Sequence, residues 1–242
     1  MAENGGKNQR DLSDSLIYRL KMRIKKSPRL FSFVYHIVGS SFLGVSAVKA
    51  LKDVPLGSVV LNLGSGVTKV RSDVVNIDMY AYENVDIVAD IANLPFENDS
   101  VDAVICEHVL EHVKDVEKVV SEIRRVLKPG GIIYAVTPFV MSFHSSPYDY
   151  RRFSEMGLEE LFKDFERIDS GMRSGPGAAL DYILAEYFGT ILSFGSRHLQ
   201  QVLSIGFLVL FAPLCWLDYL VRFFPTAQKI AHAVYYIGKK PR

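Results

Sequence analysis

The feature that most constrains the fold of this chain is an apolar run that stops abruptly at a Gly-Ser-Gly turn. Residues 59–66 read Val-Val-Leu-Asn-Leu-Gly-Ser-Gly. A short run of β-branched residues and leucine is typical of a strand buried on both faces of a parallel sheet. Open α/β sheets bind ligands at the carboxyl ends of such strands. The run therefore predicts a ligand-binding turn at the end of a central parallel strand.

Strand-like and helix-like segments alternate between about residue 57 and residue 165, which predicts an α/β domain with a parallel sheet. The expected strands are residues 59–63, 74–77, 85–89, 101–106, 132–137, 165–170 and 231–237. One helix is expected over residues 113–127, where apolar residues line one face and Lys-Pro-Gly-Gly closes it. A second helix is expected from its cap at Ser154 to Lys163.

The first two crossovers are too short to contain helices. Ten residues separate Leu63 from Val74, and seven separate Ile77 from Val85, whereas a crossover through a helix needs about a dozen or more. We therefore expect part of one sheet face to lack its usual helices and to be covered by another apolar segment.

Further segments flank this core. Residues 1–12 are polar and are interpreted as a disordered tail, and residues 13–56 as a helical segment that is first basic and then apolar. Residues 57–177 are expected to form the core domain, and residues 231–242 the last strand and tail. Between them, residues 178–230 are predicted to form an apolar helical insertion.

The insertion contains sixteen residues without a charge, Val202 to Leu217, interrupted by Pro213. This run is slightly short for a membrane-spanning helix, and Asp181 and Glu186 make a second crossing costly. Two interpretations stay open: the insertion lies in or against a membrane interface, or it packs over the bare sheet face. A similar choice, between a membrane-surface anchor and a helix packed on the domain, applies to residues 13–56.

The composition narrows the class of protein. A net charge of +1 gives no bias toward nucleic acid. The two cysteines, Cys106 and Cys215, match neither a disulfide framework nor a zinc-ligand spacing, and we predict no metal site. The first residues lack the apolar core of a signal peptide. We expect a cytoplasmic protein, peripheral at a membrane if the insertion binds one.

Acidic side chains follow neighbouring predicted strands. Asp78, Asp90 and Glu107 come at the ends of the second, third and fourth strands. Such carboxylates suit a ligand with a ribose, because Asp78 can accept from vicinal hydroxyls and Asp90 from an exocyclic amine. A dinucleotide fingerprint is disfavoured, because Lys69 occupies the position of its third glycine and the expected long helix is missing.

The order of these motifs resembles the class I methyltransferases that use S-adenosylmethionine, in particular the type 11-like group, over about residues 57–165. The matching stretches are residues 62–66, 75–78, 90–96, 100–104, 107–113, 125–131 and 144–158. The resemblance implies a compact Rossmann-like seven-stranded sheet with S-adenosylmethionine as cofactor. The residues that it places at the cofactor are Asn62, Gly64, Ser65, Gly66, Asp78, Asp90, Ile91 and Glu107. Asn62 departs from the family, which usually has an acid there, so its carbonyl oxygen would meet the cofactor's ammonium.

Methyl transfer from a sulfonium depends mainly on alignment of the acceptor with the methyl group. If the acceptor is a hydroxyl, a base must remove its proton, and we predict His144 for this role, with Asp149 and Tyr150 close by. The alternative is that these three residues only hold a loop in place. Of His108 and His112, which follow the fourth strand, one could line the cofactor pocket, and we expect a cap or surface role for His112.

The sequence therefore predicts transfer of a methyl group to a small-molecule, glycan or lipid-linked acceptor, at oxygen, with a membrane surface as a further partner and no nucleic acid. The apolar insertion motivates the lipid-linked acceptor. The alternative is a catalytically inactive cofactor-binding scaffold or regulatory subunit with the same fold.

Overall fold

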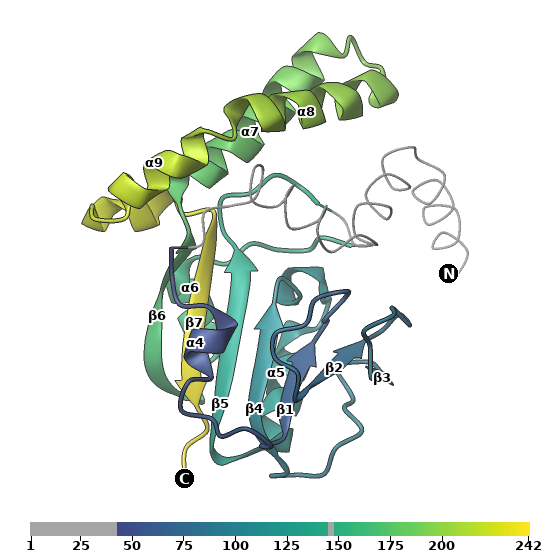
Figure 1. Cartoon of the computed structure of the whole chain (residues 1–242), viewed down its shortest axis with the longest axis vertical. Coiled ribbons are helices and arrows are strands. Elements are labelled where there is room, and N and C mark those ends of the chain that lie inside the picture. Colours follow the sequence, from purple (N-terminus) through teal and green to yellow (C-terminus); the bar gives the residue numbers. More distant parts are fainter. Residues whose placement is uncertain (1–42, 145–147) are drawn as a thin grey trace.

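The computed structural model describes residues 43–144 and 148–242 (Figure 1). The expectations for residues 1–42, including the tail and most of the basic helical segment, lie outside the described residues. The strands are β1 (Val60–Leu63), β2 (Val74–Asp78), β3 (Ile87–Val88), β4 (Val101–Glu107), β5 (Leu127–Pro138), β6 (Glu166–Ser174) and β7 (Ala233–Lys239). The helices are α4 (Ala47–Ala50), α5 (Val116–Val126), α6 (Glu155–Leu161), α7 (Pro176–Leu192), α8 (Arg197–Phe211) and α9 (Leu214–Val221), with 3-10 turns at Leu110–His112 and Pro225–Ile230.

The seven strands form one sheet in the order β3-β2-β1-β4-β5-β7-β6. Strands β1 to β5 run parallel, and β7 runs antiparallel to both β5 and β6. Each strand expected from the sequence overlaps an observed strand, so the seven-stranded Rossmann-like α/β sheet is confirmed. The order changes direction at β1 and β4, and a ligand site is expected beyond the carboxyl ends of those two strands.

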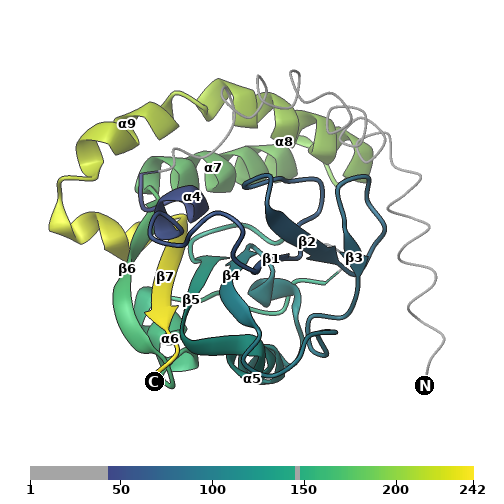
Figure 2. The ribbon, with the colours of Figure 1, turned by 60° about the horizontal axis from the view of Figure 1, so that its bottom comes forward.

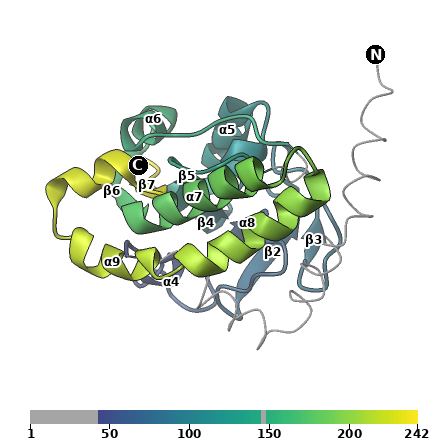
Figure 3. The same ribbon diagram turned by 90° about the horizontal axis from the view of Figure 1, so that it is seen from above.

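The two short crossovers contain no helix in their described residues, 64–73 and 79–86, as the spacing predicts. Helices α5 and α6 cover one face of the sheet, and the segment that carries α4 covers part of the other (Figure 3). On that second face Leu51 packs with Val60 and Tyr134, and the Tyr134 hydroxyl donates a 2.7 Å hydrogen bond to the Val45 carbonyl. The apolar cover expected for the bare face is therefore supplied by residues 43–56.

Helix α5 differs from the expected range at both ends. It begins at Val116 because Asp115 caps it, accepting a 3.2 Å hydrogen bond from the Lys118 amide. Its end at Val126 is followed at once by β5, so Lys-Pro-Gly-Gly belongs to the strand instead of closing the helix. Leu127 pairs with Val101, and the register then shifts by a bulge before the pairing resumes. The cap of α6 at Ser154 is confirmed, since its Oγ accepts from the Gly157 amide at 3.1 Å.

The insertion forms a separate helical layer that lies across the carboxyl ends of the parallel strands (Figures 1 and 2). The interpretation that the insertion packs over the bare sheet face is therefore wrong. The apolar cluster on that face contains residues of the 43–56 segment and none of the insertion. Among the described residues, no single helix is long and apolar enough to cross a membrane. The bent pair α8 and α9, which meet at 45°, passes the same test of length and composition when taken together.

The helical layer has its polar side chains inside. Asp218 in α9 is fully buried and accepts hydrogen bonds from the Gly177 and Ala178 amides at the start of α7, at 2.6 and 3.1 Å. Between α7 and α8, Gln200 donates to Glu186 at 2.7 Å. Glu186, one of the two acidic residues that argued against a second membrane crossing, thus has a partner within the layer.

Candidate functional site

The glycine turn after β1 has the tight geometry that its sequence predicts. Gly64 and Gly66 both have positive φ, at 63° and 54°, a region that glycine enters without steric cost. A Cβ on Gly64 would lie 2.4 Å from Val109 Cγ2, whereas a Cβ on Gly66 would meet nothing within 4 Å. The Ser65 amide donates to the Ile77 carbonyl at 3.1 Å, which holds the turn against β2. Gly64 thus serves packing as well as turning, while Gly66 leaves space above the loop.

Asp78, at the end of β2, is joined directly to this turn. Its two carboxylate oxygens accept hydrogen bonds of 2.9 Å, one from the Gly66 amide and one from the Tyr80 amide. The structure therefore brings together Gly64, Ser65, Gly66 and Asp78, the predicted centre of the cofactor site. Each carboxylate oxygen retains a second lone pair that can accept from a ribose hydroxyl.

Asn62 faces the sheet side covered by α4, and its side-chain nitrogen is bonded to the neighbouring strand. Its side-chain amide donates a 3.0 Å hydrogen bond to Asn76 Oδ1, and the Asn76 amide donates in turn to Asp86 at 3.3 Å. One N–H of the Asn62 amide is thus used by the neighbouring strand, which leaves its carbonyl oxygen available to the cofactor's ammonium as predicted.

The remaining predicted cofactor residues lie at the ends of the next strands. Asp90 is exposed and caps the turn that carries Ile91, accepting a 2.9 Å hydrogen bond from the Ala92 amide. Glu107 lies on the same side of β4 as Ile105, since alternate residues of a strand share a face. Burial raises the pKa of the Tyr134 hydroxyl, and the negative charge of Glu107 raises it further. Glu107 therefore lies beside Tyr134 on the α4 face.

A cluster of imidazoles surrounds Glu111 where β4 and β5 end. His108, with a positive φ of 55°, turns the chain out of β4, and the 3-10 turn that follows places Glu111 and His112 next to it. Glu111 Oε1 lies 3.6 Å from His108 Nδ1, 3.8 Å from His112 Nε2 and 3.7 Å from His144 Nε2. Glu111 is fully buried. We name these four residues, His108, Glu111, His112 and His144, the imidazole cluster.

The loop after β5 carries His144 into this cluster. The Tyr150 amide donates to the Glu111 carbonyl at 2.8 Å, and the His144 amide donates to Asp149 Oδ2 at 2.8 Å. Arg152 forms a two-point ion pair with Asp149, and the guanidinium lowers the pKa of that carboxyl to about 2. His144 and Asp149 are thus brought together as predicted, while the Tyr150 side chain is exposed, with its ring 5.6 Å from that of Tyr148.

The protonation states of the cluster follow from its surroundings. Burial by itself would raise the pKa of Glu111, but the neighbouring imidazoles of His108 and His144 lower it to about 2. Burial, together with the positive charges of His108, His144 and Arg152, lowers the pKa of His232 to about 3. These surroundings favour the charged form of the Glu111 carboxyl and the neutral form of the buried His232 imidazole.

Three residues of this site and the orientation of a fourth were missed by the sequence analysis. Glu111, Arg152 and His232 were not singled out, and His112 turns inward to Glu111 with 15% of its side chain exposed, so its expected surface role is wrong. The spacing His108-x-x-Glu111-His112 carried the available signal, because a short turn can gather all three. Nothing local in the sequence indicated that His144 would join them.

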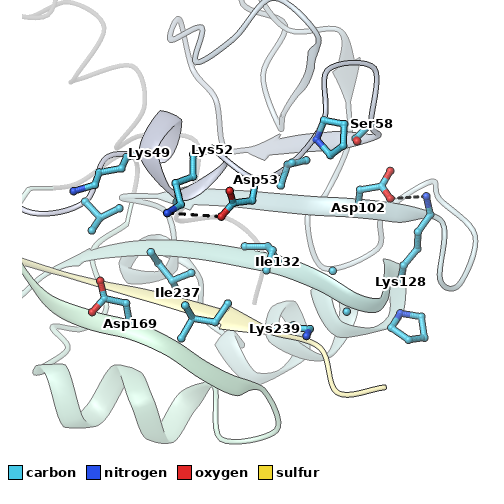
Figure 4. Close-up of a pocket in the computed structure, with 18 residues that line it drawn as sticks. Lys49, Lys52, Asp53, Ser58, Asp102, Lys128, Ile132, Asp169, Ile237 and Lys239 are labelled. Carbon is cyan, nitrogen blue, oxygen red and sulfur yellow. Dashed lines mark hydrogen bonds and ion pairs between the residues drawn. The ribbon is translucent and has the colours of Figure 1, made fainter.

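A separate groove lies on the α4 face, toward the amino ends of the strands (Figure 4). Lys49, Asp102, Lys128 and Ile237 are among the side chains that line it. It shares no residue with the glycine turn, Asp78 or the imidazole cluster, so it is distinct from the candidate site.

Comparison with known proteins agrees with this arrangement. Residues 61–135 match the family model described as a methyltransferase domain, a range that runs from β1 through β5. The chain thus carries a methyltransferase domain over residues 61–135. The chain is 33% identical over 120 residues to a Mycolicibacterium smegmatis protein described as an S-adenosylmethionine-dependent methyltransferase, covering 46% of either chain. It is 43% identical over 77 residues to a 2-phytyl-1,4-naphtoquinone methyltransferase of Nostoc punctiforme, covering 31% of either chain.

The chain therefore matches less than half the length of these curated relatives. Among solved structures, it is similar to a Galdieria sulphuraria protein described as a sarcosine dimethylglycine methyltransferase, with a TM-score of 0.51 and 14% identity over 87% of this chain and 97% of the other. At that identity the likeness shows a shared fold alone.

Proposed function

We propose that this methyltransferase transfers a methyl group from S-adenosylmethionine to an oxygen of a small-molecule, glycan or lipid-linked acceptor. The observation that carries the proposal is the contact between Gly64 and Val109, which fits a glycine only. It sets the cofactor turn against the segment that carries His108 and Glu111. A methyl group held at the turn would therefore face an acceptor held at the imidazole cluster.

The proposed reaction is an in-line displacement. The acceptor oxygen forms a bond to the methyl carbon, the carbon–sulfur bond breaks, and the sulfonium becomes a neutral thioether. Alignment of the two substrates supplies much of the acceleration. The proton of the acceptor hydroxyl passes to an imidazole of the cluster, for which His144 is the candidate identified from the sequence.

The lipid-linked acceptor is supported by the helical layer over the same edge of the sheet. Outward-facing apolar side chains of this layer are widely exposed, with Phe194 at 90%, Phe223 at 71% and Leu220 at 67%. Its buried positions include Asp181, Ser204 and Asp218. Polar groups inside and apolar groups outside suit a surface that meets lipid instead of water. The Nostoc punctiforme relative is named for a phytyl-substituted, apolar acceptor.

The test is a labelling experiment with S-adenosylmethionine that carries a radioactive methyl group. The full chain is incubated separately with a membrane extract and with a water-soluble extract, and label is expected in the lipid fraction. Alkali-stable, acid-stable label attached to oxygen supports the proposed chemistry, and label in water-soluble products alone contradicts the lipid-linked acceptor. If S-adenosylhomocysteine binds but neither extract becomes labelled, the scaffold alternative is favoured.

A further inference from the structure

The imidazole cluster has a geometry that hydrogen bonding does not explain. Glu111 is fully buried, yet no described residue donates a hydrogen bond to either of its carboxylate oxygens. The nearest nitrogens, on His108, His112 and His144, lie 3.6 to 3.8 Å from Oε1. Those separations exceed the 2.7–3.2 Å of ordinary N–H···O bonds, so about half an ångström more separates the groups than direct bonding requires. Buried carboxylate oxygens without a hydrogen-bond donor are costly unless another partner satisfies them.

The separations fit ligands that share one metal ion. A metal with nitrogen and oxygen ligands at about 2.0–2.1 Å in tetrahedral geometry holds those ligand atoms about 3.4 Å apart. Glu111 Oε1 lies 3.8 Å from His112 Nε2 and 3.7 Å from His144 Nε2. One ligand atom from each of these three residues can be chosen so that all lie within 4.8 Å of one another. A small inward movement of each side chain would therefore complete the coordination.

The outer partners of the two histidines point the same ring nitrogen inward. His112 Nδ1 is hydrogen-bonded to the Tyr148 carbonyl, which can only accept, so Nδ1 carries the proton and Nε2 keeps its lone pair. His144 Nδ1 lies 3.6 Å from Asp149 Oδ2, and it is hydrogen-bonded at 3.5 Å to Arg152 Nη2, which can only donate. Metal-binding histidines are commonly oriented by a carbonyl or a carboxylate on the outer ring nitrogen.

We propose that Glu111, His112 and His144 bind a divalent transition-metal ion of the Zn²⁺ type beside the acceptor position. Two imidazoles with one carboxylate suit zinc or iron better than magnesium or calcium, which prefer oxygen ligands. Three protein ligands leave a coordination position open, and an acceptor oxygen is the ligand that would occupy it. The metal site itself does not depend on the proposed function. Only the binding of the acceptor to the metal rests on the proposed function.

This site changes the part that His144 plays. As a metal ligand its Nε2 lone pair is occupied, so His144 does not act as the base. The bound ion would lower the pKa of a coordinated acceptor hydroxyl. His108, whose Nδ1 lies 3.6 Å from the same Glu111 oxygen but which is outside the ligand set, is then the imidazole left to receive the proton.

The test is a titration of the full chain, without an affinity tag and stripped with a chelator, with ZnCl₂ in a calorimeter. Saturable binding of one ion at micromolar or tighter affinity is expected, and MgCl₂ should give no heat. His112→Ala and His144→Ala should each weaken Zn²⁺ binding by about 100-fold or more. The matched control is His198→Ala, which removes an exposed histidine on α8 and should leave the affinity unchanged.

Two further readouts keep the result unambiguous. Co²⁺ should give a visible ligand-field absorption band with the parent chain and with His198→Ala, but not with a His112→Ala/His144→Ala double variant whose circular dichroism is unchanged. Equal Zn²⁺ affinity of the parent chain and this folded double variant would overturn the metal site. Titration of the same samples with S-adenosylhomocysteine separates the proposals: cofactor binding without Zn²⁺ binding refutes the metal site alone, whereas Zn²⁺ binding without cofactor binding refutes the proposed methyl transfer alone.

Discussion

The backbone amide of Gly66 donates a 2.9 Å hydrogen bond to Oδ2 of Asp78, so the glycine turn and the end of β2 are joined where the ribose is proposed to lie. A carboxylate that already accepts from two amides is fixed in orientation before any ligand arrives. Preorganisation of this kind reduces the entropy lost on binding.

Replacement of Asp78 is therefore expected to weaken cofactor binding. Asp78→Asn keeps the size of the side chain but removes its charge, and hydrogen bonds to a charged group contribute about 1.5–3 kcal/mol each. We expect the affinity for S-adenosylhomocysteine, measured by calorimetry, to fall by about 10- to 100-fold. Asp53→Asn, at an exposed carboxylate that lies 3.8 Å from Lys52 Nζ, is the control. Equal affinities of the two variants would contradict the ribose role.

Gly64→Ala is expected to destabilise the domain more than an alanine at another glycine with positive φ. At Gly64 the new methyl would lie 2.4 Å from Val109 Cγ2, whereas at Gly57, with φ of 84°, it would meet nothing within 4 Å. The left-handed backbone costs about 1–2 kcal/mol at either site, and overpacking adds about 1–3 kcal/mol at Gly64 alone.

Urea unfolding of both variants measures this difference. Val109→Ala in the Gly64→Ala background should recover part of the loss, because it removes the two methyl groups that the new side chain strikes. If Gly57→Ala and Gly64→Ala lose the same stability, the close contact is not the reason for glycine at residue 64.

The stability of the helical layer should depend on pH through Asp181. This residue is fully buried, and burial raises its pKa to about 7, opposed by a hydrogen bond from the Cys215 thiol. In the unfolded chain the carboxyl ionises near pH 4. Between about pH 4 and pH 7 the unfolded state therefore holds fewer protons than the folded state, and the free energy of unfolding falls as the pH rises.

Asp181→Asn removes the titrating carboxyl and therefore this pH dependence of the free energy of unfolding. Three pKa units correspond to at most about 4 kcal/mol, so the variant should gain stability over the parent chain as the pH is raised from 5 to 8. Unfolding in urea at several pH values measures the difference, with Asp53→Asn as the exposed control. Parallel pH profiles of Asp181→Asn and the parent chain would show that Asp181 is not protonated in the fold.

The single tryptophan of the chain, Trp216, provides a direct probe of the proposed membrane surface. It lies in α9 and is 64% exposed. Transfer from water into lipid should shift its fluorescence emission to shorter wavelength when vesicles of mixed neutral and anionic phospholipids are added. No shift, at lipid concentrations that saturate other peripheral proteins, would contradict the lipid-facing role of α9.

The same assay tests the neighbouring exposed leucine. Leu220→Glu should weaken vesicle binding by about 10-fold or more, because burial of a leucine side chain contributes about 1.5–3 kcal/mol. Met156→Glu, at an exposed apolar residue of α6 outside the helical layer, should not change it. Equal partitioning of the two variants would place the binding surface elsewhere.

The sequence by itself determined the core of this protein. Apolar periodicity, the Gly-Ser-Gly turn and the short gaps between strands predicted the parallel strands and the missing crossover helices. These features depend on local backbone geometry and on the rule that parallel strands end at one edge, so they can be read from spacing alone.

Only the tertiary structure decided what gathers around that edge. The inward turn of His112 depends on the 55° φ of His108 and on the bond from the Tyr150 amide to the Glu111 carbonyl, which joins segments almost forty residues apart. The layer formed by α7, α8 and α9 likewise buries Asp218 at the start of α7, a pairing across about forty residues. Side-chain direction in irregular turns and the choice of partner between distant helices are set by packing, which a local pattern does not encode.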